Sequence, residues 1–398
     1  MRPPRRFISM MALALSASVW PSAPSVATHH LISPGERWET LAEKIKPGDE
    51  LILMPGKHRA ARFDTIVGEA DAPVIVRSAD PANPAVIHAE RYGIEIGHAR
   101  HVQIRDLSIT GATINGVRLG STASGDDEKT RSRIVHLANL KITKTGRKGQ
   151  RHAVYVEHTD RLTIEGLVIE SWAGSGIEIV GCTEVRIEGC TLRGDSDPTP
   201  AAGIRVRGGS DRVRIDKCEL TDTGDQGIAI GGLTKLDAFD PPLDPAAEAG
   251  SLTEASRVHV SRCVIRNGLC AVSFVNAERS SVSNCTLLRP RRTVLSIRRD
   301  QTDPRFASVR NCTFGSNLIV WEPGDLASLG HIGPATDDAT VYLEENLWWS
   351  SDLAEAAADL GAFPGEEQFA QLTELDPALD DTLKPTVASA ELFGAHAP

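Results

Sequence analysis

The chain has 398 residues, in which 53 Asp and Glu outnumber 43 Lys and Arg, and its formal net charge at pH 7 is −10. An acidic chain is repelled by phosphate backbones, so we expect no nucleic acid partner. No segment has the ~20 consecutive apolar residues that a membrane-spanning helix needs, and we expect no membrane span.

Residues 1–27 have the pattern of a targeting segment. Arg2, Arg5 and Arg6 precede a mostly apolar stretch at 7–20, and the small residues Ser25 and Ala27 flank a suitable cleavage site. We therefore expect residues 1–27 to be a Sec-type bacterial signal peptide. The mature protein would then be secreted or periplasmic.

Residues 28–60 are expected to form an N-terminal cap and the first strand. Ser33, Pro34 and Glu36 occupy the N-cap, first and third positions of a helix start. Trp38 and Leu41 would then lie on the buried face of a short helix that covers the open end of the following repeat. The turn at 46–49 would lead into a first strand at 51–54.

Residues 61–350 contain one repeated pattern, apolar-x-apolar-x-x-slot-x-apolar, in which the slot recurs at intervals of 22 to 45 residues. Strict apolar alternation predicts short strands with one buried face, and a period near 22 residues predicts a solenoid. The sequence thus predicts an all-β, right-handed single-stranded parallel β-helix with a short N-terminal helical cap. Five slots hold cysteines that we expect to be buried and reduced: Cys190, Cys218, Cys263, Cys285 and Cys312.

Residues 351–398 lack the repeat, and we expect a C-terminal capping tail.

Insertions in the repeat indicate where a binding surface lies. The long ones are at 121–133, 144–152, 194–201 and 232–257, and we expect all four to enter at one corner, before a strand that opens on glycine. That strand would be the floor of a groove. Alternation predicts its outward side chains, in one row Glu95, Arg118, Tyr155, Glu178, Arg205, Ala229, Ser273 and Ser296, and in a second row Glu157, Arg207 and Arg298.

Arg205 and Arg207 are the leading binding candidates. Small residues surround both, so we expect accessible guanidinium heads, and for Arg207 no buried partner. Paired guanidinium groups suit the carboxylates or sulfates of an acidic polysaccharide. The alternative is that Glu178 simply pairs with Arg205 across adjacent strands. Further candidates for substrate binding are Glu178, Glu157, Gln226 and Arg298.

Two other charged groups are weaker candidates. Glu165, Glu188 and Asp216 would stack on the second strand's outer face, either as a calcium site or as a solvated surface. The arginines between 289 and 299 would be surface charge or a rim for an anionic chain. We assign no metal ligands and expect no cofactor, with calcium as the only candidate.

The chain resembles the pectate-lyase-like right-handed β-helix superfamily over most of residues 30–350. The opening KPGDELILMPGKH at 46–58 looks like the start of polysaccharide lyase family 6 proteins. The stretches at 175–182, 203–210, 224–232, 317–321 and 345–349 resemble uncharacterised exported β-helix proteins. The resemblance departs from family 6 at the site: no lysine lies on the groove strand, Arg207 occupies the place where similar proteins tend to carry lysine, and the calcium cluster has no match.

The resemblance implies a lyase that cleaves an acidic polysaccharide by β-elimination at a uronate. Arg205 and Arg207 would then neutralise the carboxylate, and Tyr155, His152 or Lys235 would be the base. The alternatives are a non-catalytic carbohydrate-binding protein and a glycoside hydrolase that uses Glu157 and Glu178. We expect a monomer.

Overall fold

The computed structural model describes residues 27–120, 131–146, 151–196, 199–239, 242–352, 371–372, 376–387 and 390–397. Residues 1–26, which carry the predicted signal peptide, lie outside this part. In the described ranges, no helix is long and apolar enough to cross a membrane.

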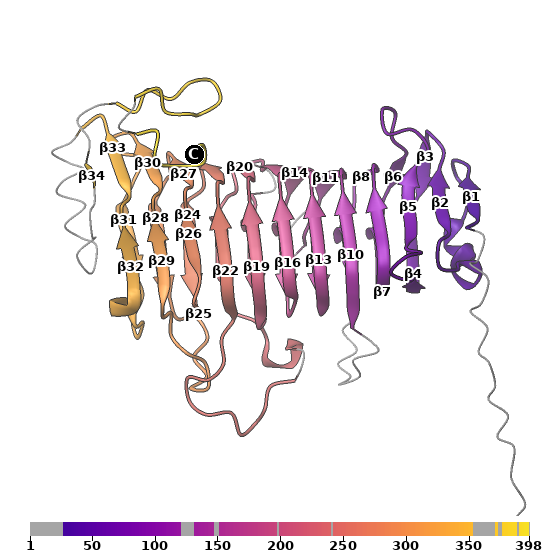
Figure 1. Cartoon of the computed structure of the whole chain (residues 1–398), viewed down its shortest axis with the longest axis horizontal. Coiled ribbons are helices and arrows are strands. Elements are labelled where there is room, and N and C mark those ends of the chain that lie inside the picture. Colours follow the sequence, from indigo (N-terminus) through magenta and orange to yellow (C-terminus); the bar gives the residue numbers. More distant parts are fainter. Residues whose placement is uncertain are drawn as a thin grey trace, which may run out of the picture.

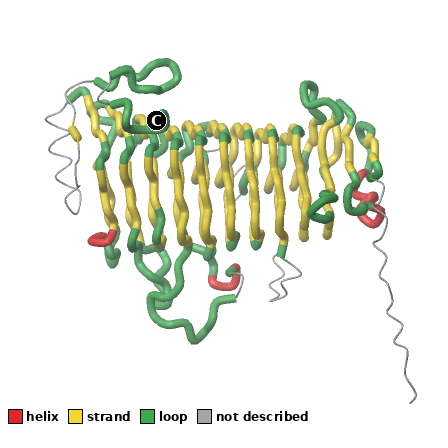
Figure 2. Tube along the Cα trace, in the orientation of Figure 1, coloured by secondary structure: helices red, strands yellow, loops and turns green. Residues whose placement is uncertain are grey.

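The chain forms an elongated solenoid of short strands stacked in parallel (Figures 1 and 2). Its strands lie on three faces. The glycine face consists of β4 (Ala61–Val67), the start of β7 (Tyr92–Arg105), β9 (Asn115–Leu119), β12 (Val154–Glu157), β15 (Ser175–Val180), β18 (Ala202–Arg207), β21 (Gln226–Gly231), β24 (Cys270–Val275), β28 (Thr293–Arg298) and β31 (Ser328–Ile332).

The middle face follows the glycine face in each coil. It consists of β1 (His29–Ile32), β2 (Glu50–Leu53), β5 (Val74–Ser78), the end of β7, β10 (Ser132–Ala138), β13 (Thr159–Glu165), β16 (Thr183–Glu188), β19 (Ser210–Asp216), β22 (Ala255–Ser261), β25 (Ala277–Glu278), β26 (Ser281–Ser283), β29 (Cys312–Gly315) and β32 (Val341–Glu344). Because β7 runs through the corner, these two faces form one 22-stranded sheet.

The third face is a separate 12-stranded sheet. It consists of β3 (Lys57–Arg59), β6 (Val86–His88), β8 (Ser108–Thr110), β11 (Lys141–Thr145), β14 (Val168–Trp172), β17 (Thr191–Arg193), β20 (Glu219–Thr221), β23 (Val264–Arg266), β27 (Thr286–Leu288), β30 (Leu318–Trp321), β33 (Leu347–Ser350) and β34 (Gln371–Leu372).

The core is a column of inward-facing aliphatic side chains that repeat from coil to coil. Ile177, Ile204, Ile228 and Val272 are in register on neighbouring strands, and all four are fully buried. Outward residues alternate with these inward ones along each strand, as a period of two requires. The burial of this repeated row is what fixes the register of the groove strands.

The slot residues stack at the corner that leads to the third face. All seven cysteines are buried and free of disulfide bonds, as expected for the five predicted ladder members. Cys190, Cys218, Cys263 and Cys285 occupy this corner, but the position predicted for Cys312 is wrong. Cys312 opens the middle-face strand β29, and Asn317 takes the slot of that coil, where its Oδ1 accepts a hydrogen bond from the Cys285 backbone N–H (2.9 Å). Burial raises the pKa of the Cys312 thiol to about 12. Asn139 and Asn284 turn the chain just before a slot with φ of 52° and 51°, a left-handed conformation that asparagine tolerates. Asn311 has the same conformation (φ 52°) but precedes the middle-face strand β29.

We expect alkylation under denaturing conditions to label all five cysteines predicted for the ladder without prior reduction. A buried thiol of raised pKa is a poor nucleophile, so the folded protein should react much more slowly. Mass spectrometry of the labelled peptides checks both statements. Two or more disulfides among these positions would contradict the ladder.

The N-terminal cap differs from its prediction in two respects. The helix is a 3-10 helix, η1 (Trp38–Lys44), and its N-cap is Arg37 rather than Ser33. The Ser33 backbone N–H instead donates to the Glu36 carboxylate (2.8 Å), which closes a turn ahead of the helix. In addition, β1 pairs in parallel with β2, so the strand predicted to be the first is the second. Trp38 is buried edge-to-face against the Phe63 ring (5.4 Å) and closes this end.

The described part of the C-terminal segment lies against the outside of the third face. Leu318 and Leu347 point outward from β30 and β33, and Ala390 and Phe393 cover them. The Ala395 N–H donates to the Thr286 hydroxyl (2.9 Å). Leucine side chains that point outward need an apolar cover, which explains why the C-terminal segment packs here.

The insertions enter at two corners, so the prediction of a single corner is wrong. Insertions 144–152 and 194–201 precede glycine-face strands, as expected. Insertions 121–133 and 232–257 instead follow β9 and β21, on the way to the middle face. The glycine face is therefore flanked from both edges, and the segment after β21 forms a long loop with its own short helix, η2 (Leu236–Ala238) (Figure 2).

Candidate functional site

The outward row of the glycine face has the predicted register throughout. Each member from Glu95 to Ser296 lies opposite the next on the neighbouring strand. The structure extends this row by one residue at each end, to Arg62 and His331. The row is therefore a continuous strip along the solenoid.

In the N-terminal half of this strip, the charged side chains pair with one another. Arg118 bridges Glu95 (3.1 Å) and the buried Glu157 (2.9 Å). The Tyr155 hydroxyl donates to the other oxygen of Glu157 (2.9 Å). Burial, together with the Glu157 carboxylate, raises the pKa of Tyr155 above its ordinary range. The Tyr155 hydroxyl is thus protonated and committed to an acceptor.

Glu178 is the centre of a buried charge network, and its side chain has no exposed surface. It accepts a hydrogen bond from the Ser175 hydroxyl (2.5 Å) and pairs with Nε of Arg207. Burial alone would raise the pKa of Glu178, but His152, Arg207 and Arg205 outweigh it and lower this pKa to about 2. Glu178 is therefore ionised at neutral pH.

His152 completes this network as a neutral group. Its Nδ1 accepts a hydrogen bond from the Ser175 backbone N–H (2.9 Å) and lies 3.6 Å from the Glu178 carboxylate. Burial, aided by the charges of Arg207 and Arg205, lowers the pKa of His152 to about 4. Since Nδ1 is already an acceptor and the ring is buried, this nitrogen is not available to a ligand.

Arg207 is a structural link between the sheet and the loop that follows β21. Besides Glu178, it donates to the Thr234 hydroxyl (3.1 Å), which in turn donates to the fully buried Glu254 (2.6 Å). Only 11% of the Arg207 side chain is exposed. The prediction of an accessible Arg207 head without a buried partner is wrong, because Glu178 and Thr234 approach it from two sides.

Arg205 has the opposite environment. It is half-buried, and it makes no hydrogen bond or ion pair with any residue of the described ranges. The alternative in which Glu178 pairs with Arg205 is therefore also wrong: the partner is Arg207, one rung and two residues away. Arg205 retains a free guanidinium on the groove floor.

A recess of about 300 Å³ lies beside Arg205. Its lining residues are Arg205, Arg207, Gln226, Gly231, Gly232, Leu233, Val275, Arg298 and Asp300. Gly231 has a φ of 93°, and a Cβ there would lie 1.7 Å from the Val275 carbonyl oxygen, so only glycine fits. The structure thus brings together four predicted site residues: Arg205, Arg207, Gln226 and Arg298.

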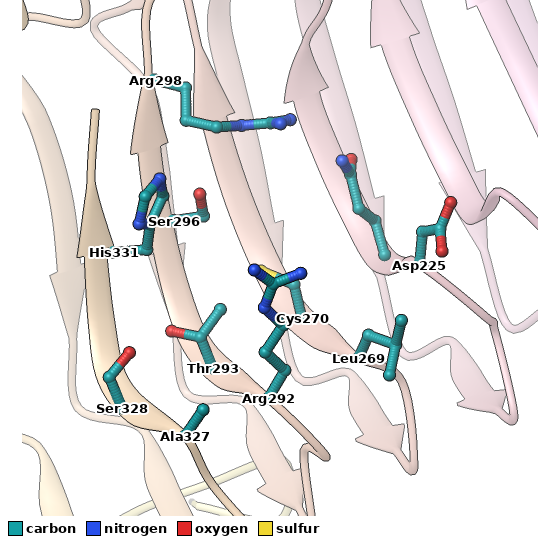
Figure 3. Close-up of a pocket in the computed structure, with 11 residues that line it drawn as sticks. Asp225, Leu269, Cys270, Arg292, Thr293, Ser296, Arg298, Ala327, Ser328 and His331 are labelled. Carbon is teal, nitrogen blue, oxygen red and sulfur yellow. The ribbon is translucent and has the colours of Figure 1, made fainter. Parts of the chain in front are cut away.

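A larger recess of about 490 Å³ adjoins the first, since Gln226 and Arg298 line both. It also contains Arg292, Ser296, Ser328 and His331 (Figure 3). We selected neither His331 nor Ser328 from the sequence. The alternation at 328–332 could have identified His331, but the slots of the last two coils hold Asn317 and Asn346 instead of Cys or Leu, and the predicted ladder ended at position 312.

The predicted site residues that line neither recess are Tyr155, His152, Glu157, Glu178 and Lys235. Lys235 is exposed at the N-cap of η2, in the loop after β21. Gln226, by contrast, points along the floor, where its Oε1 accepts a hydrogen bond from Ser273 (3.0 Å). Arg298 pairs with Asp300 (3.4 Å) at the boundary of the two recesses.

The predicted acidic stack has the expected register, but each carboxylate lies beside a basic side chain of its own. Asp216 pairs with Arg262 (2.5 Å), Glu188 with Arg186, and Glu165 with His136 (3.4 Å). In the ranges that the structure describes, no group of three or more His, Cys, Asp or Glu side chains is arranged to hold a metal ion. These ion pairs fit a solvated surface.

The basic cluster at 289–299 is divided between two surfaces. Arg289 pairs with Asp325 (3.2 Å) and Arg291 with Asp222 (3.2 Å), away from the large recess's floor. Arg292 and Arg298 line the large recess. Part of this cluster therefore belongs to the groove.

Comparisons with known proteins identify the fold. Residues 127–287 match the family model described as a right-handed β-helix region. No curated protein sequence matches the chain. The A-module of the Azotobacter vinelandii mannuronan C-5 epimerase AlgE6 is similar in structure, with a TM-score of 0.52 and 15% identity over 81% of this chain and 90% of that one. The fold is thus a right-handed parallel β-helix, as predicted.

Two alginate lyases have lower structural similarity. The family 6 enzyme AlyGC has a TM-score of 0.47 and 11% identity. The matched region covers 92% of this chain and only 56% of the AlyGC chain. The enzyme from Paenibacillus sp. str. FPU-7 has a TM-score of 0.45 and 16% identity over 80% of this chain and 99% of that one. These likenesses concern the fold.

Proposed function

We propose that the glycine face binds an acidic polysaccharide and that Arg205 holds one of its acid groups. The observation that carries this proposal is the free guanidinium of Arg205, beside two arginines whose charges are engaged by Glu178 and Asp300. A guanidinium presents several donors in a planar fork that matches a carboxylate or sulfate. A half-buried guanidinium without an anion gains most from such a ligand.

The shape of the groove supports a polymer as the ligand. The two recesses share Gln226 and Arg298 and extend over five successive strands of the glycine face, from β18 to β31. Their linings combine arginines with hydroxyl and amide groups, which suit a chain that carries both acid and hydroxyl groups. The mannuronan epimerase is a precedent for an acidic polysaccharide on this fold.

The chemistry of the first recess favours binding over catalysis there. Tyr155 and His152 are committed to Glu157 and Ser175, and Lys235 does not line the recess. Hydrolysis by Glu157 and Glu178 would need one protonated carboxyl group as the acid. Both are buried in ion pairs, and the pKa of Glu178 is lowered to about 2. We include export by the predicted signal peptide in this proposal, because extracellular polysaccharides require it.

Calorimetric titration of the mature chain, residues 28–398, with alginate, chondroitin, pectate and heparin tests the proposal. For the polymer that binds best, Arg205→Ala should lower the affinity by about 10- to 150-fold, the scale of a charge-assisted hydrogen bond. Arg205→Ala should leave the thermal midpoint nearly unchanged, since Arg205 makes no hydrogen bond or ion pair and Glu178 keeps its pairing with Arg207. The matched control is Arg186→Ala on the middle face, which should leave the affinity unchanged. Equal affinities of Arg205→Ala and wild type would contradict the proposal.

A further inference from the structure

We infer that His331 is the general base of a β-elimination carried out in the large recess. This inference rests on the proposed function, because it requires an acidic polysaccharide in the groove. His331 lies on β31, directly opposite Ser296 on β28, and it is exposed. In the part of the chain that the structure describes, the imidazole has no hydrogen bond or ion pair. Its two nitrogens are therefore open to a ligand.

The charges around His331 suit proton removal from a uronate. The charged groups that line its recess are Arg292, Arg298 and Asp225. Arg298 extends from β28 across the neighbouring strands, and Arg292 lies nearer the start of the same strand (Figure 3). The Arg292 guanidinium, joined by Arg298 in exchange for its pairing with Asp300, would neutralise the uronate carboxylate and stabilise the carbanion that develops at C5. This is the condition under which an imidazole can remove the C5 proton.

No other group in the recess fits the role of base. Burial raises the pKa of Cys270 to about 12, so its thiol is protonated. The Thr293 hydroxyl donates to the Leu329 carbonyl oxygen (3.1 Å), and the Ser328 hydroxyl donates to that of Gly330 (3.1 Å). Asp225 stands on the opposite side of the recess from His331 (Figure 3). Histidine is the side chain that most readily exchanges a proton near neutral pH.

The reaction balances with His331 alone. The imidazole takes the C5 proton, and the C5–H electron pair becomes the second bond between C4 and C5. The C4–O bond breaks, and its electron pair stays on the leaving oxygen. The imidazolium then returns its proton to that oxygen, which yields an unsaturated uronate end, a new hydroxyl end and the neutral histidine. No oxidant, reductant or water is consumed.

The test is the ultraviolet absorbance of unsaturated ends when the mature chain is incubated with alginate, chondroitin, pectate and heparin. We expect product from at least one polymer. His331→Ala should lower the initial rate by about 100-fold or more, the usual contribution of a general base. Added imidazole should restore part of the rate, which a merely structural role would not allow. The control is His88→Ala, an exposed histidine on the third face, which should retain the wild-type rate.

The outcomes separate this inference from the proposed function. If a polymer binds wild type and not Arg205→Ala, but no polymer is cleaved, the inference fails and the binding proposal stands. Cleavage that is undiminished in His331→Ala, or that imidazole does not restore, also overturns the inference. If no polymer binds at all, both fail. If the inference is right, His331→Ala should bind the polymer in calorimetry with the same affinity as wild type.

Discussion

Arg207→Ala should destabilise the protein by about 3–5 kcal/mol, the usual cost of removing one partner of a buried ion pair. Glu178 is fully buried, and its carboxylate would remain charged without the guanidinium that now pairs with it. The change also removes the hydrogen bond to Thr234, which holds the start of the loop after β21. A lower urea midpoint, followed by circular dichroism, is the expected result.

Two variants make this prediction specific. Arg205→Ala, two residues away on the same strand, should unfold at the wild-type midpoint because it leaves no buried charge unpaired. The double change Glu178→Leu with Arg207→Met should restore most of the lost stability, since it removes both charges together. If Arg207→Ala unfolds like wild type, the network around Glu178 does not stabilise the fold as described.

Acidification should destabilise the protein in two overlapping stages. The pKa of His152 is about 4 in the folded protein and 6.5 ordinarily, so the unfolded chain binds a proton that the folded one excludes. This contribution to stability is present above pH 6.5 and is lost toward pH 4. The pKa of Glu178 is about 2 against 4.5 ordinarily, so its contribution is present above pH 4.5 and is lost toward pH 2. Each stage is worth on the order of a few kcal/mol.

The two stages can be assigned by substitution. His152→Gln can retain an acceptor for the Ser175 N–H but cannot take up a proton. Its urea midpoint should therefore change less than that of wild type between pH 6.5 and pH 4, and both should decline below pH 4.5. A variant whose midpoint follows the wild-type curve over the whole range would contradict the role given to His152.

The repeat made the strand register predictable. Alternation with a period of two, anchored by a slot residue in each coil, is sufficient to place Tyr155, Glu178 and Arg205 in one outward row. The pattern does not determine which charges meet. Arg207 reaches Glu178 diagonally, and Thr234 and Glu254 come from a loop that has no repeat to fix it.

The same limit explains why the predicted site was centred too far toward the N-terminus. Outward phase alone identifies Arg118, Tyr155 and Glu157 as available groups. In the structure these side chains satisfy one another, so the open recesses begin only at Arg205. Arg205 and Arg207 are two positions apart in the sequence, but their surroundings differ. Arg205 lies open on the groove floor for a ligand, whereas Arg207 pairs with Glu178 and stabilises the fold.

A crystal structure of the mature chain with an acidic hexasaccharide, cut from the polymer that binds best, is the most direct test of the binding site. We predict that the sugar chain lies along the glycine face over both recesses, with one of its acid groups on the Arg205 guanidinium. Arg207 should keep its contact with Glu178 in that complex. A sugar chain bound on the middle face, beside Arg186 and Arg214, would contradict the account.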